Sequence, residues 1–405
     1  MTKTLNDVLH PTRVDAFLTE VWGSRPQHWS RADARFASLL SWDELNVILE
    51  RHRLDHPRLR LSKEGKDLPR DAFLNDQSTR RGVTVPRLNV AGLHAALGDG
   101  AMLVMDAIDE IVPAIEAVAL DMERVFGESV QVNAYAGWKT SQGFSTHWDD
   151  HDVIVLQLYG CKDWRVFPQT REFPLYKDID FDLEAPKGEP LLKLRLEPGD
   201  ALYIPRGWWH DARPCGEPTL HLTFGITKRT AIDFIEALSE KLRHDPVFRQ
   251  DLPRFASLEL QDRHLKAMRE RLLEAFDGTT MSEYFAVGEA RAAIRRRPSV
   301  PWPSLERDAE GWKAGGYSVQ LLSRRTPVIE RAGGDITLKL GGKKLTLVQH
   351  SAPLLDLLVS GEKVNIERLI EVGRSSDVAE SDVLGLVQEL MKLGVVSVQA
   401  PVAPR

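Results

Sequence analysis

The sequence predicts a chain of the α+β class whose central part is an antiparallel β-barrel or jelly roll. Between residues 130 and 227, short runs of β-branched and apolar residues alternate with turn residues at close intervals. Before and after this part, apolar residues recur at a helical period. The predicted strands of the central part are 130–135, 152–159, 163–167, 191–196, 200–204 and 219–224.

Residues 1 to about 128 are predicted to be a helical lead-in to the barrel. Ser41-Trp-Asp-Glu44 has the form of a capping box, in which two side chains satisfy backbone N–H groups at the start of a helix. The segment Ala107–Phe126 predicts a helix that ends at Gly127, because glycine readily adopts the left-handed conformation that closes helices. The polar segment Lys63–Arg81 predicts a solvated loop.

Two further domains are predicted after the barrel, with boundaries at 1–228, 229–300 and 301–405. Residues 229–300 carry apolar helical stripes that suit either a helical bundle or a dimer surface, and the proline-rich stretch 295–303 predicts a linker. A homodimer is therefore expected.

The C-terminal domain is predicted to be winged-helix-like. Gly341-Gly342 between two strand patterns, 335–340 and 343–348, predicts a two-residue hairpin turn. Helical patterns at 352–360, 365–372 and 377–393 and a strand pattern at 395–398 follow. Acidic and basic residues nearly balance there, so the basic surface that phosphate contacts require is missing, and no nucleic-acid binding is expected.

Composition excludes several classes of protein. The 405 residues carry a formal net charge of −6, which indicates neither a nucleic-acid binder nor an acidic tail. The sequence shows no apolar run near the ~20 residues of a membrane span, and no signal-peptide core at its start. Cys161 and Cys215 have neither metal-like nor disulfide-like spacing, which favours a reducing, cytoplasmic location.

The strongest candidate site combines His147, Asp149 and His210. If the pair His147 and Asp149 belongs to the strand that follows it, both side chains point to one face. His210 follows another predicted strand, 200–205. A lone His-x-Asp pair occurs by chance, and such histidines are often only structural. Two imidazoles and one carboxylate in this context, however, are the facial triad of non-haem Fe(II) oxygenases.

An oxygenase of this kind needs electrons, which 2-oxoglutarate commonly supplies while it chelates the iron. The distal carboxylate of 2-oxoglutarate then needs a cation, and Lys162 is the candidate; the alternative is an ordinary surface lysine. Asn133 and Tyr135, two apart on a neighbouring strand, either contact cofactor or substrate or satisfy backbone groups.

Other aromatic and polar residues gather in sequence around the ligands. Trp138, Trp148, Trp208 and Trp209 suggest an aromatic-walled mouth that could hold a peptide side chain. His151, a third imidazole, is expected beside the metal site or on the surface.

The motifs together resemble the JmjC-type ribosomal oxygenases, also called the cupin-4 group, over about residues 130–227. The matching motifs are Asn133-Ala-Tyr135, Ser141-Gln-Gly-Phe144, His147-Trp-Asp149-Asp150, Leu156-Gln-Leu-Tyr-Gly160, Lys162-Asp-Trp164-Arg-Val and Pro198-Gly-Asp200-Ala-Leu-Tyr-Ile-Pro205-Arg-Gly-Trp-Trp-His210. The resemblance implies a double-stranded β-helix of jelly-roll or cupin type. It also implies Fe(II) bound by His147, Asp149 and His210, 2-oxoglutarate as co-substrate and O₂ as oxidant.

The resemblance also implies roles for other residues and a class of substrate. Lys162 matches the position that binds the distal carboxylate of 2-oxoglutarate, and Asn133 matches a pocket residue near it. Family members hydroxylate arginine or histidine side chains of large-subunit ribosomal proteins. The bulky Trp148 departs from the family pattern and leaves the substrate open. The alternatives are a tailoring hydroxylase of a small amino-acid-derived metabolite and a non-catalytic binding module.

Overall fold

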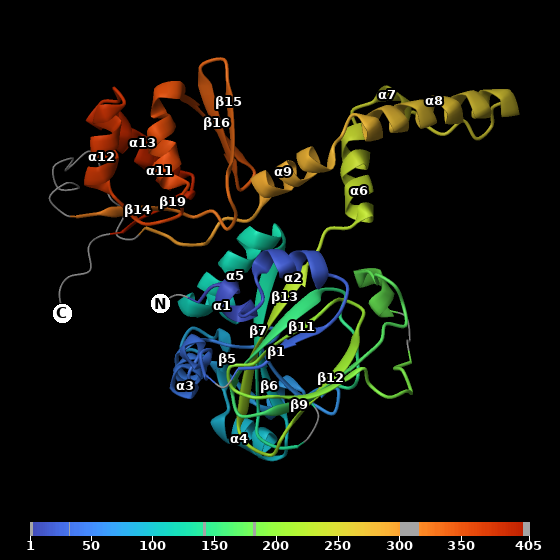
Figure 1. The fold of residues 1–405 in the computed structure, drawn as a ribbon, viewed down its shortest axis with the longest axis vertical. Helices are drawn as coiled ribbons and strands as arrows, with labels where there is room; N and C mark the ends of the chain where they lie inside the picture. Colours follow the sequence, from blue (N-terminus) through green and yellow to red (C-terminus); the bar gives the residue numbers. More distant parts are fainter. Residues whose placement is uncertain (1–2, 32, 141–142, 181–183, 300–315, 400–405) are drawn as a thin grey trace. The chain divides into compact units, whose positions relative to one another are not determined.

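Figure 1 traces the chain in a computed structural model, which describes residues 3–31, 33–140, 143–180, 184–299 and 316–399. Contacts divide the chain into two units, Met1–Lys228 and Arg229–Arg405. The predicted boundary at 300/301 lies outside the described residues, as do the end of the predicted linker and Ser141 and Gln142 of one motif. A further division of 229–405 therefore stays a prediction. Among the described helices, none combines the length and the apolar character needed to span a bilayer.

Two antiparallel sheets form the framework of the first unit. Their strands are β1 (Gln27–Trp29), β2 (Leu59–Lys63), β3 (Lys66–Asp67), β6 (Met102–Met105), β7 (Ser129–Gly137), β8 (Asp152–Tyr159), β9 (Lys162–Phe167), β10 (Leu192–Leu196), β11 (Ala201–Ile204), β12 (Trp209–Pro214) and β13 (Thr219–Thr227). The larger sheet has the order β1-β11-β8-β13-β7-β6-β2-β3, and the smaller one the order β10-β9-β12. Every predicted strand of the central part is present, and β12 is an addition.

Strand β8 is buried on both faces, which explains its unbroken apolar run. Val153 and Val155 pack with Trp164 of β9 in a core between the two sheets. Ile154 and Leu156, which alternate with them, pack into a second core with the N-terminal helices. The sheet is thus the middle of three layers, and its inner face is available to hold a site.

The helices of the first unit are α1 (Leu5–Leu9), α2 (Val14–Glu20), α3 (Trp42–Arg51), α4 (Val90–Gly98) and α5 (Pro113–Phe126). Figure 1 shows α1, α2 and α5 together over one side of the larger sheet, and their apolar residues share its core. Gly127, at φ +65°, ends α5 as predicted. The helix begins at Pro113 rather than at Ala107, because Ala107 is left-handed and a short 3₁₀ turn follows it.

The lead-in contains more β-structure than the sequence predicts. Strands β1, β2, β3 and β6 extend the larger sheet, and a separate hairpin joins β4 (Leu74–Ser78) to β5 (Thr84–Leu88). The prediction of a solvated loop over 63–81 is therefore wrong for β3 and β4. These strands are short, and β4 is almost wholly exposed, so no apolar pattern marks it. Ser41 does cap α3, since its hydroxyl accepts the N–H of Glu44.

The second unit begins with helices and ends in a segment of mixed helices and strands. Its helices are α6 (Ala231–Leu242), α7 (Pro246–Arg249), α8 (Leu258–Asp277), α9 (Met281–Arg291), α11 (Ala352–Leu358), α12 (Ile366–Ser375) and α13 (Glu380–Lys392). Its strands are β14 (Ser318–Leu321), β15 (Val328–Ala332), β16 (Asp335–Leu340), β17 (Lys343–Val348), β18 (Val364–Asn365) and β19 (Val396–Gln399). Helices α11 to α13 share one core with β14, β16 and β19, and the predicted hairpin turns at Gly341-Gly342. By contrast, α8 has no buried residue.

Candidate metal centre

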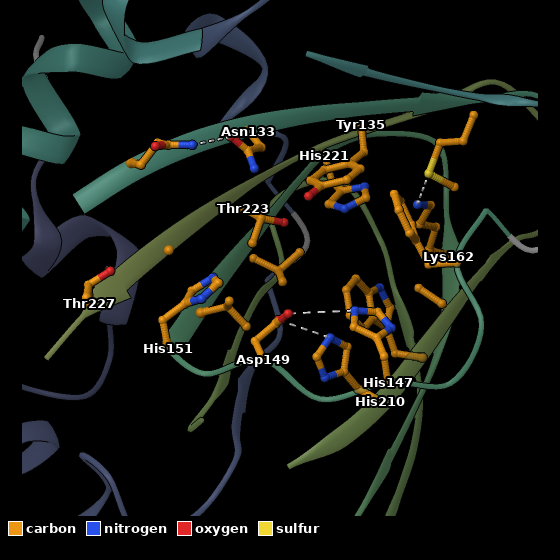
Figure 2. A pocket seen from close by; sticks show the side chains of 18 residues that line it. Asn133, Tyr135, His147, Asp149, His151, Lys162, His210, His221, Thr223 and Thr227 are labelled. Atoms are coloured by element: carbon orange, nitrogen blue, oxygen red, sulfur yellow. Dashed lines mark hydrogen bonds and ion pairs between the residues drawn. The ribbon is translucent and has the colours of Figure 1, made fainter. Parts of the chain in front are cut away.

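A cavity of about 350 Å³ lies between the two sheets of the first unit (Figure 2). Alternate residues of β7 and β13 line one wall, because side chains at i and i+2 share a face of a strand. Strands β9 and β12 supply the opposite wall. The strand residues that line it are Gln131, Asn133, Tyr135, Val153, Val155, Lys162, Trp164, His210, Ala212, His221, Thr223, Gly225 and Thr227. Met102, Phe144, His147, Asp149 and His151 complete the lining.

Three of these side chains face one another. His147, Asp149 and His210 each offer one ligand atom, and these atoms all lie within 4.8 Å of one another. The carboxylate of Asp149 lies 3.8 Å from His147 Nε2 and 3.5 Å from His210 Nε2, and Figure 2 shows it directed at both rings. Two imidazoles and one carboxylate on one side of an ion would leave its other coordination positions open toward the cavity.

Backbone pairing brings the two histidines together across a long stretch of sequence. The pair His147 and Asp149 lies in the loop before β8, which begins at Asp152, so the alternation of a strand does not aim it. Instead, His147 and His210 form an isolated antiparallel bridge, with N–H to O distances of 3.1 and 2.7 Å. The condition that the pair belongs to the strand is therefore not met, although the residues converge.

The backbone also fixes the orientation of both imidazole rings. His147 Nδ1 lies 2.7 Å from the carbonyl oxygen of Ser145, and His210 Nδ1 lies 3.0 Å from that of Trp208. A carbonyl oxygen only accepts hydrogen bonds, so each Nδ1 donates, and in the neutral imidazole Nε2 then keeps its lone pair. This arrangement selects the tautomer that binds a metal through Nε2 and holds the ring in place for it.

A tight turn before His210 holds the loop that carries Asp149. The N–H of Gly207 donates to the carbonyl oxygen of Asp149 at 2.9 Å. The preceding N–H, that of Arg206, donates to Asp152 Oδ1 at 3.0 Å. Gly207 has φ +81°, and a Cβ there would lie 2.7 Å from Cδ of Pro174, so only glycine fits the turn.

Asp152 is a buried carboxylate three residues after the ligand Asp149. Its side chain is fully buried, and besides Arg206 it accepts hydrogen bonds from Lys228 Nζ at 2.8 Å and from the hydroxyl of Tyr203. All three partners are hydrogen-bond donors to the carboxylate. Asp152 therefore ties the loop of Asp149 to the turn before His210, and the sequence reading missed it.

Burial and neighbouring charges shift the pKa values of two of the ligands, His210 and Asp149. Burial, together with the nearby His147, lowers the pKa of His210 to about 4, so its imidazole is neutral at physiological pH. Burial acts to raise the pKa of Asp149, but the attraction of His210, His147 and His151 outweighs it, and the pKa falls below its ordinary value. A neutral imidazole and an ionised carboxylate are the forms that coordinate metals.

Lys162, the first residue of β9, places an ammonium group inside the cavity. The residue is only 1% exposed. Within the described part of the chain, its sole hydrogen-bond partner is the sulfur of Met102, at 3.7 Å. Burial lowers the pKa of Lys162 to about 7. A buried cation without a counter-ion is costly, so this position suits an anionic ligand. The structure excludes the alternative of a surface lysine.

Two further polar groups near Lys162 lack partners. His221 Nδ1 and Trp164 Nε1 are buried, and neither forms a hydrogen bond with any described residue. The ring of His221 stacks on Tyr135, with centroids 4.9 Å apart, and burial and Lys162 hold its pKa well below the ordinary value. The sequence reading did not single out these two residues. The alternation Thr219, His221, Thr223, Gly225 along β13 was the available signal.

Asn133 and Tyr135 both line the cavity, as their spacing predicts. Asn133 Oδ1 also accepts the backbone N–H of Ala107 at 3.0 Å and the side-chain amide of Gln131 at 3.2 Å. Burial raises the pKa of Tyr135 to about 12, so the phenol keeps its proton. Both proposed roles of Asn133, in the pocket and on the backbone, are thus compatible with its position.

The predicted aromatic mouth is not where the sequence suggested. Among the described residues that line the cavity, tryptophan is contributed by Trp164 alone. Trp138 packs instead against the ring of Trp42, with centroids 5.5 Å apart, and Trp209 is buried. His151, expected beside the site or on the surface, lines the cavity.

With the fold and the site described, the class of the protein follows. Residues 113–234 match the family model described as a JmjC domain, and the two facing sheets are the cupin fold of that family. This part of the chain is therefore similar to a JmjC domain.

Part of the chain is also similar in sequence to ribosomal oxygenases. Ribosomal oxygenase 1 of Homo sapiens is 40% identical over 144 residues, which cover 33% of this chain and 22% of that protein. The bifunctional lysine-specific demethylase and histidyl-hydroxylase NO66 of Culex quinquefasciatus is 26% identical over 257 residues, 60% of this chain and 38% of that protein. The chain spans well under half the length of these relatives.

A similar fold occurs in a bacterial ribosomal oxygenase. The structure of YcfD from Escherichia coli in complex with cobalt and 2-oxoglutarate is 17% identical, with a TM-score of 0.59. The match covers 96% of this chain and 99% of that one. At this identity the likeness shows a shared fold.

Proposed function

We propose that the chain is an Fe(II)- and 2-oxoglutarate-dependent oxygenase that hydroxylates an amino-acid side chain of a ribosomal protein or another peptide. The observation that carries the proposal is Lys162. Its buried ammonium group has no counter-ion among the described residues and lies in the same cavity as two imidazoles and a carboxylate. A metal centre with an anion site beside it is the requirement of a keto-acid co-substrate that chelates through one end.

The residues divide into those that hold the metal and those that hold the co-substrate. His147, Asp149 and His210 would bind the ferrous ion through Nε2, a carboxylate oxygen and Nε2. The distal carboxylate of 2-oxoglutarate would accept a charge-assisted hydrogen bond from Lys162. His221 and Trp164, whose buried nitrogens lack partners, are further candidates to contact it.

Bound iron, 2-oxoglutarate and O₂ supply the oxidation of an unactivated C–H bond, with succinate and CO₂ as the other products. The protein orients the ligands and excludes water. Val153, Val155 and Ala212 line the cavity with apolar surface between the polar groups. The backbone hydrogen bonds to both Nδ1 atoms keep the histidines from turning when the ion is absent.

Of the two expected target side chains, histidine suits the cavity better than arginine. Among the described residues that line it, the only carboxylate is Asp149, which serves as a metal ligand. A guanidinium group that entered beside His151 would therefore find no free negative charge among these lining residues to pair with. The name of one relative, a histidyl-hydroxylase, agrees with this choice.

Turnover of 2-oxoglutarate tests the proposal. Purified protein with Fe(II), ascorbate and 2-oxoglutarate should release succinate, and ribosomal proteins should gain the mass of one oxygen atom only when the gene is present. Absence of succinate would favour a non-catalytic binding module. Succinate release with unmodified ribosomal proteins would favour a small-metabolite substrate.

We also propose a homodimer formed through α8 and located in the cytoplasm. Helix α8 has no buried residue, and Leu258, Leu265 and Leu272 are exposed along it. A second copy that covers this stripe would remove it from water. Leu265→Glu combined with Leu272→Glu should halve the mass measured by light scattering. Both cysteines are free, which suits a reducing compartment, and cell fractionation would test that location.

A further inference from the structure

The cavity has two ends with the metal centre between them. In Figure 2, Lys162 lies at one end, and His151 and Thr227 lie at the other. His147, Asp149 and His210 lie between the two ends. The proposed function assigns the Lys162 end to 2-oxoglutarate. The other end then remains for the substrate side chain that is oxidised.

His151 occupies the second end because Gly225 makes room for it. A Cβ atom at Gly225 would lie 2.9 Å from Cδ2 and 3.0 Å from Nε2 of the imidazole, closer than real Cβ contacts. Gly225 does not have a positive φ, so the backbone of β13 does not itself require glycine. The absence of a side chain at Gly225 therefore leaves space for the ring of His151, which lies against β13.

The two nitrogens of the His151 ring differ in their hydrogen bonding. Nδ1 lies 2.9 Å from Oδ1 of Asp150, and a carboxylate oxygen accepts, so Nδ1 donates. Nε2 has no hydrogen-bond partner among the described residues, while the side chain remains 34% exposed in a residue that lines the cavity. The ring is thus held by Asp150 and Gly225 and presents a polar atom to whatever enters.

Besides the carboxylates of Asp149 and Asp150, three neutral polar side chains lie near this end. Gln131, Thr223 and Thr227 also line the cavity, and each can both donate and accept hydrogen bonds. An uncharged side chain with its own donor and acceptor, such as an imidazole or a carboxamide, would find partners there.

We propose that His151 is a specificity-determining residue, whose Nε2 forms a hydrogen bond with the uncharged side chain of the substrate and orients the carbon to be oxidised. This inference rests on the proposed function. It predicts that a change at His151 alters the capture of substrate, while the binding of metal and of 2-oxoglutarate stays as in the wild type.

The test compares His151→Phe, His151→Gln and Gly225→Ala. Phenylalanine keeps a ring against β13 and removes Nε2, whereas the amide of glutamine reaches the position of Nε2. Alanine at 225 displaces the ring of an unchanged His151. The exposed His94 of α4, which does not line this cavity, provides the control variant His94→Phe.

The probe is the set of large-subunit ribosomal proteins extracted from cells that lack the gene, with hydroxylation measured by mass spectrometry. We expect KM to rise about tenfold for His151→Phe and for Gly225→Ala, as for the loss of one hydrogen bond. His151→Gln should recover most of this loss, and His94→Phe should match the wild type. Dissociation constants for Co²⁺ and 2-oxoglutarate should stay within about twofold of wild type in all variants.

The outcomes separate this inference from the proposed function. If the wild type forms no succinate from 2-oxoglutarate, the proposed function fails, whatever His151 does. If the wild type is active and His151→Phe keeps the wild-type KM, the inference is overturned. Weaker binding of 2-oxoglutarate by His151→Phe would also overturn it, because the residue would then serve the other end of the cavity.

Discussion

Replacement of Lys162 by methionine should make the protein more stable and less able to bind 2-oxoglutarate. Burial holds the pKa of this residue at about 7, against an ordinary value of 10.5. At about 1.4 kcal/mol for each pH unit, the charged form destabilises the folded protein by roughly 4 to 5 kcal/mol below pH 7. Methionine has a similar length and no charge, so it removes this destabilisation.

The pH dependence of the free energy of unfolding shows whether the charge on Lys162 destabilises the folded protein. Between pH 7 and pH 10.5 the unfolded chain keeps a proton on Lys162 that the folded protein releases. The free energy of unfolding of the wild type without ligand therefore rises with pH over this window. In Lys162→Met the rise should be absent, and the variant should be more stable by up to about 4 kcal/mol at pH 7. Urea denaturation at several pH values measures both quantities.

The same substitution should lower the affinity for the co-substrate, although it raises stability. A hydrogen bond between charged groups contributes about 1.5 to 3 kcal/mol, so Lys162→Met should bind 2-oxoglutarate roughly 10- to 150-fold more weakly in calorimetry of the metal-loaded protein. The exposed Lys66 of β3 gives the control Lys66→Met, which should change neither quantity. A Lys162→Met protein that is less stable than the wild type, or that keeps wild-type affinity, would refute the reasoning.

Three further substitutions test the metal centre and its support. His210→Ala should abolish Co²⁺ binding in equilibrium dialysis and all turnover of 2-oxoglutarate; retention of either contradicts the triad. Asp152→Asn should weaken Co²⁺ binding at least about tenfold in chelator competition, because the turn and the ligand loop lose their shared charged partner. Asp200→Asn alters another buried carboxylate, which pairs with His28 and backbone N–H groups away from the ligands. Asp200→Asn should lower stability but not Co²⁺ affinity. Equal losses of Co²⁺ affinity in Asp152→Asn and Asp200→Asn would show that the role of Asp152 is merely structural. Gly207→Ala, strained at φ +81°, should lower the melting temperature and the Co²⁺ affinity together, and a normal affinity would contradict the role of the turn.

The sequence allowed prediction where one local pattern decides the outcome. The run 152–159 coincides with β8, because burial on both faces produces an unbroken apolar stretch. Gly127 and Gly341-Gly342 mark turns that need positive φ, and all three glycines adopt it. Residue chemistry likewise identified His147, Asp149 and His210 as a group.

The sequence did not allow prediction where distant segments decide the outcome. The bridge between His147 and His210 depends on tertiary pairing, and the first ligand pair does not belong to the strand that follows it. Asp152 looked like the start of a strand, and only the fold brings Lys228 and Tyr203 to it. The alternation along β13 could have identified His221 as a residue that faces the cavity. A single polar residue inside an apolar run, however, rarely shows whether a strand lines a cavity or packs in a core.

The tautomers fixed by Ser145 and Trp208 have a consequence for the choice of ion. Because both rings are set before any metal arrives, the ligands do not have to rearrange around ferrous iron. Three ligands fix only part of a coordination sphere, so the site offers little geometric discrimination among divalent cations. Nitrogen and oxygen donors of this kind bind cobalt, nickel and copper more tightly than iron. Occupancy by iron must therefore follow from the abundance of iron in the cell. An excess of a divalent ion that binds more tightly should displace iron and inhibit the protein without unfolding it.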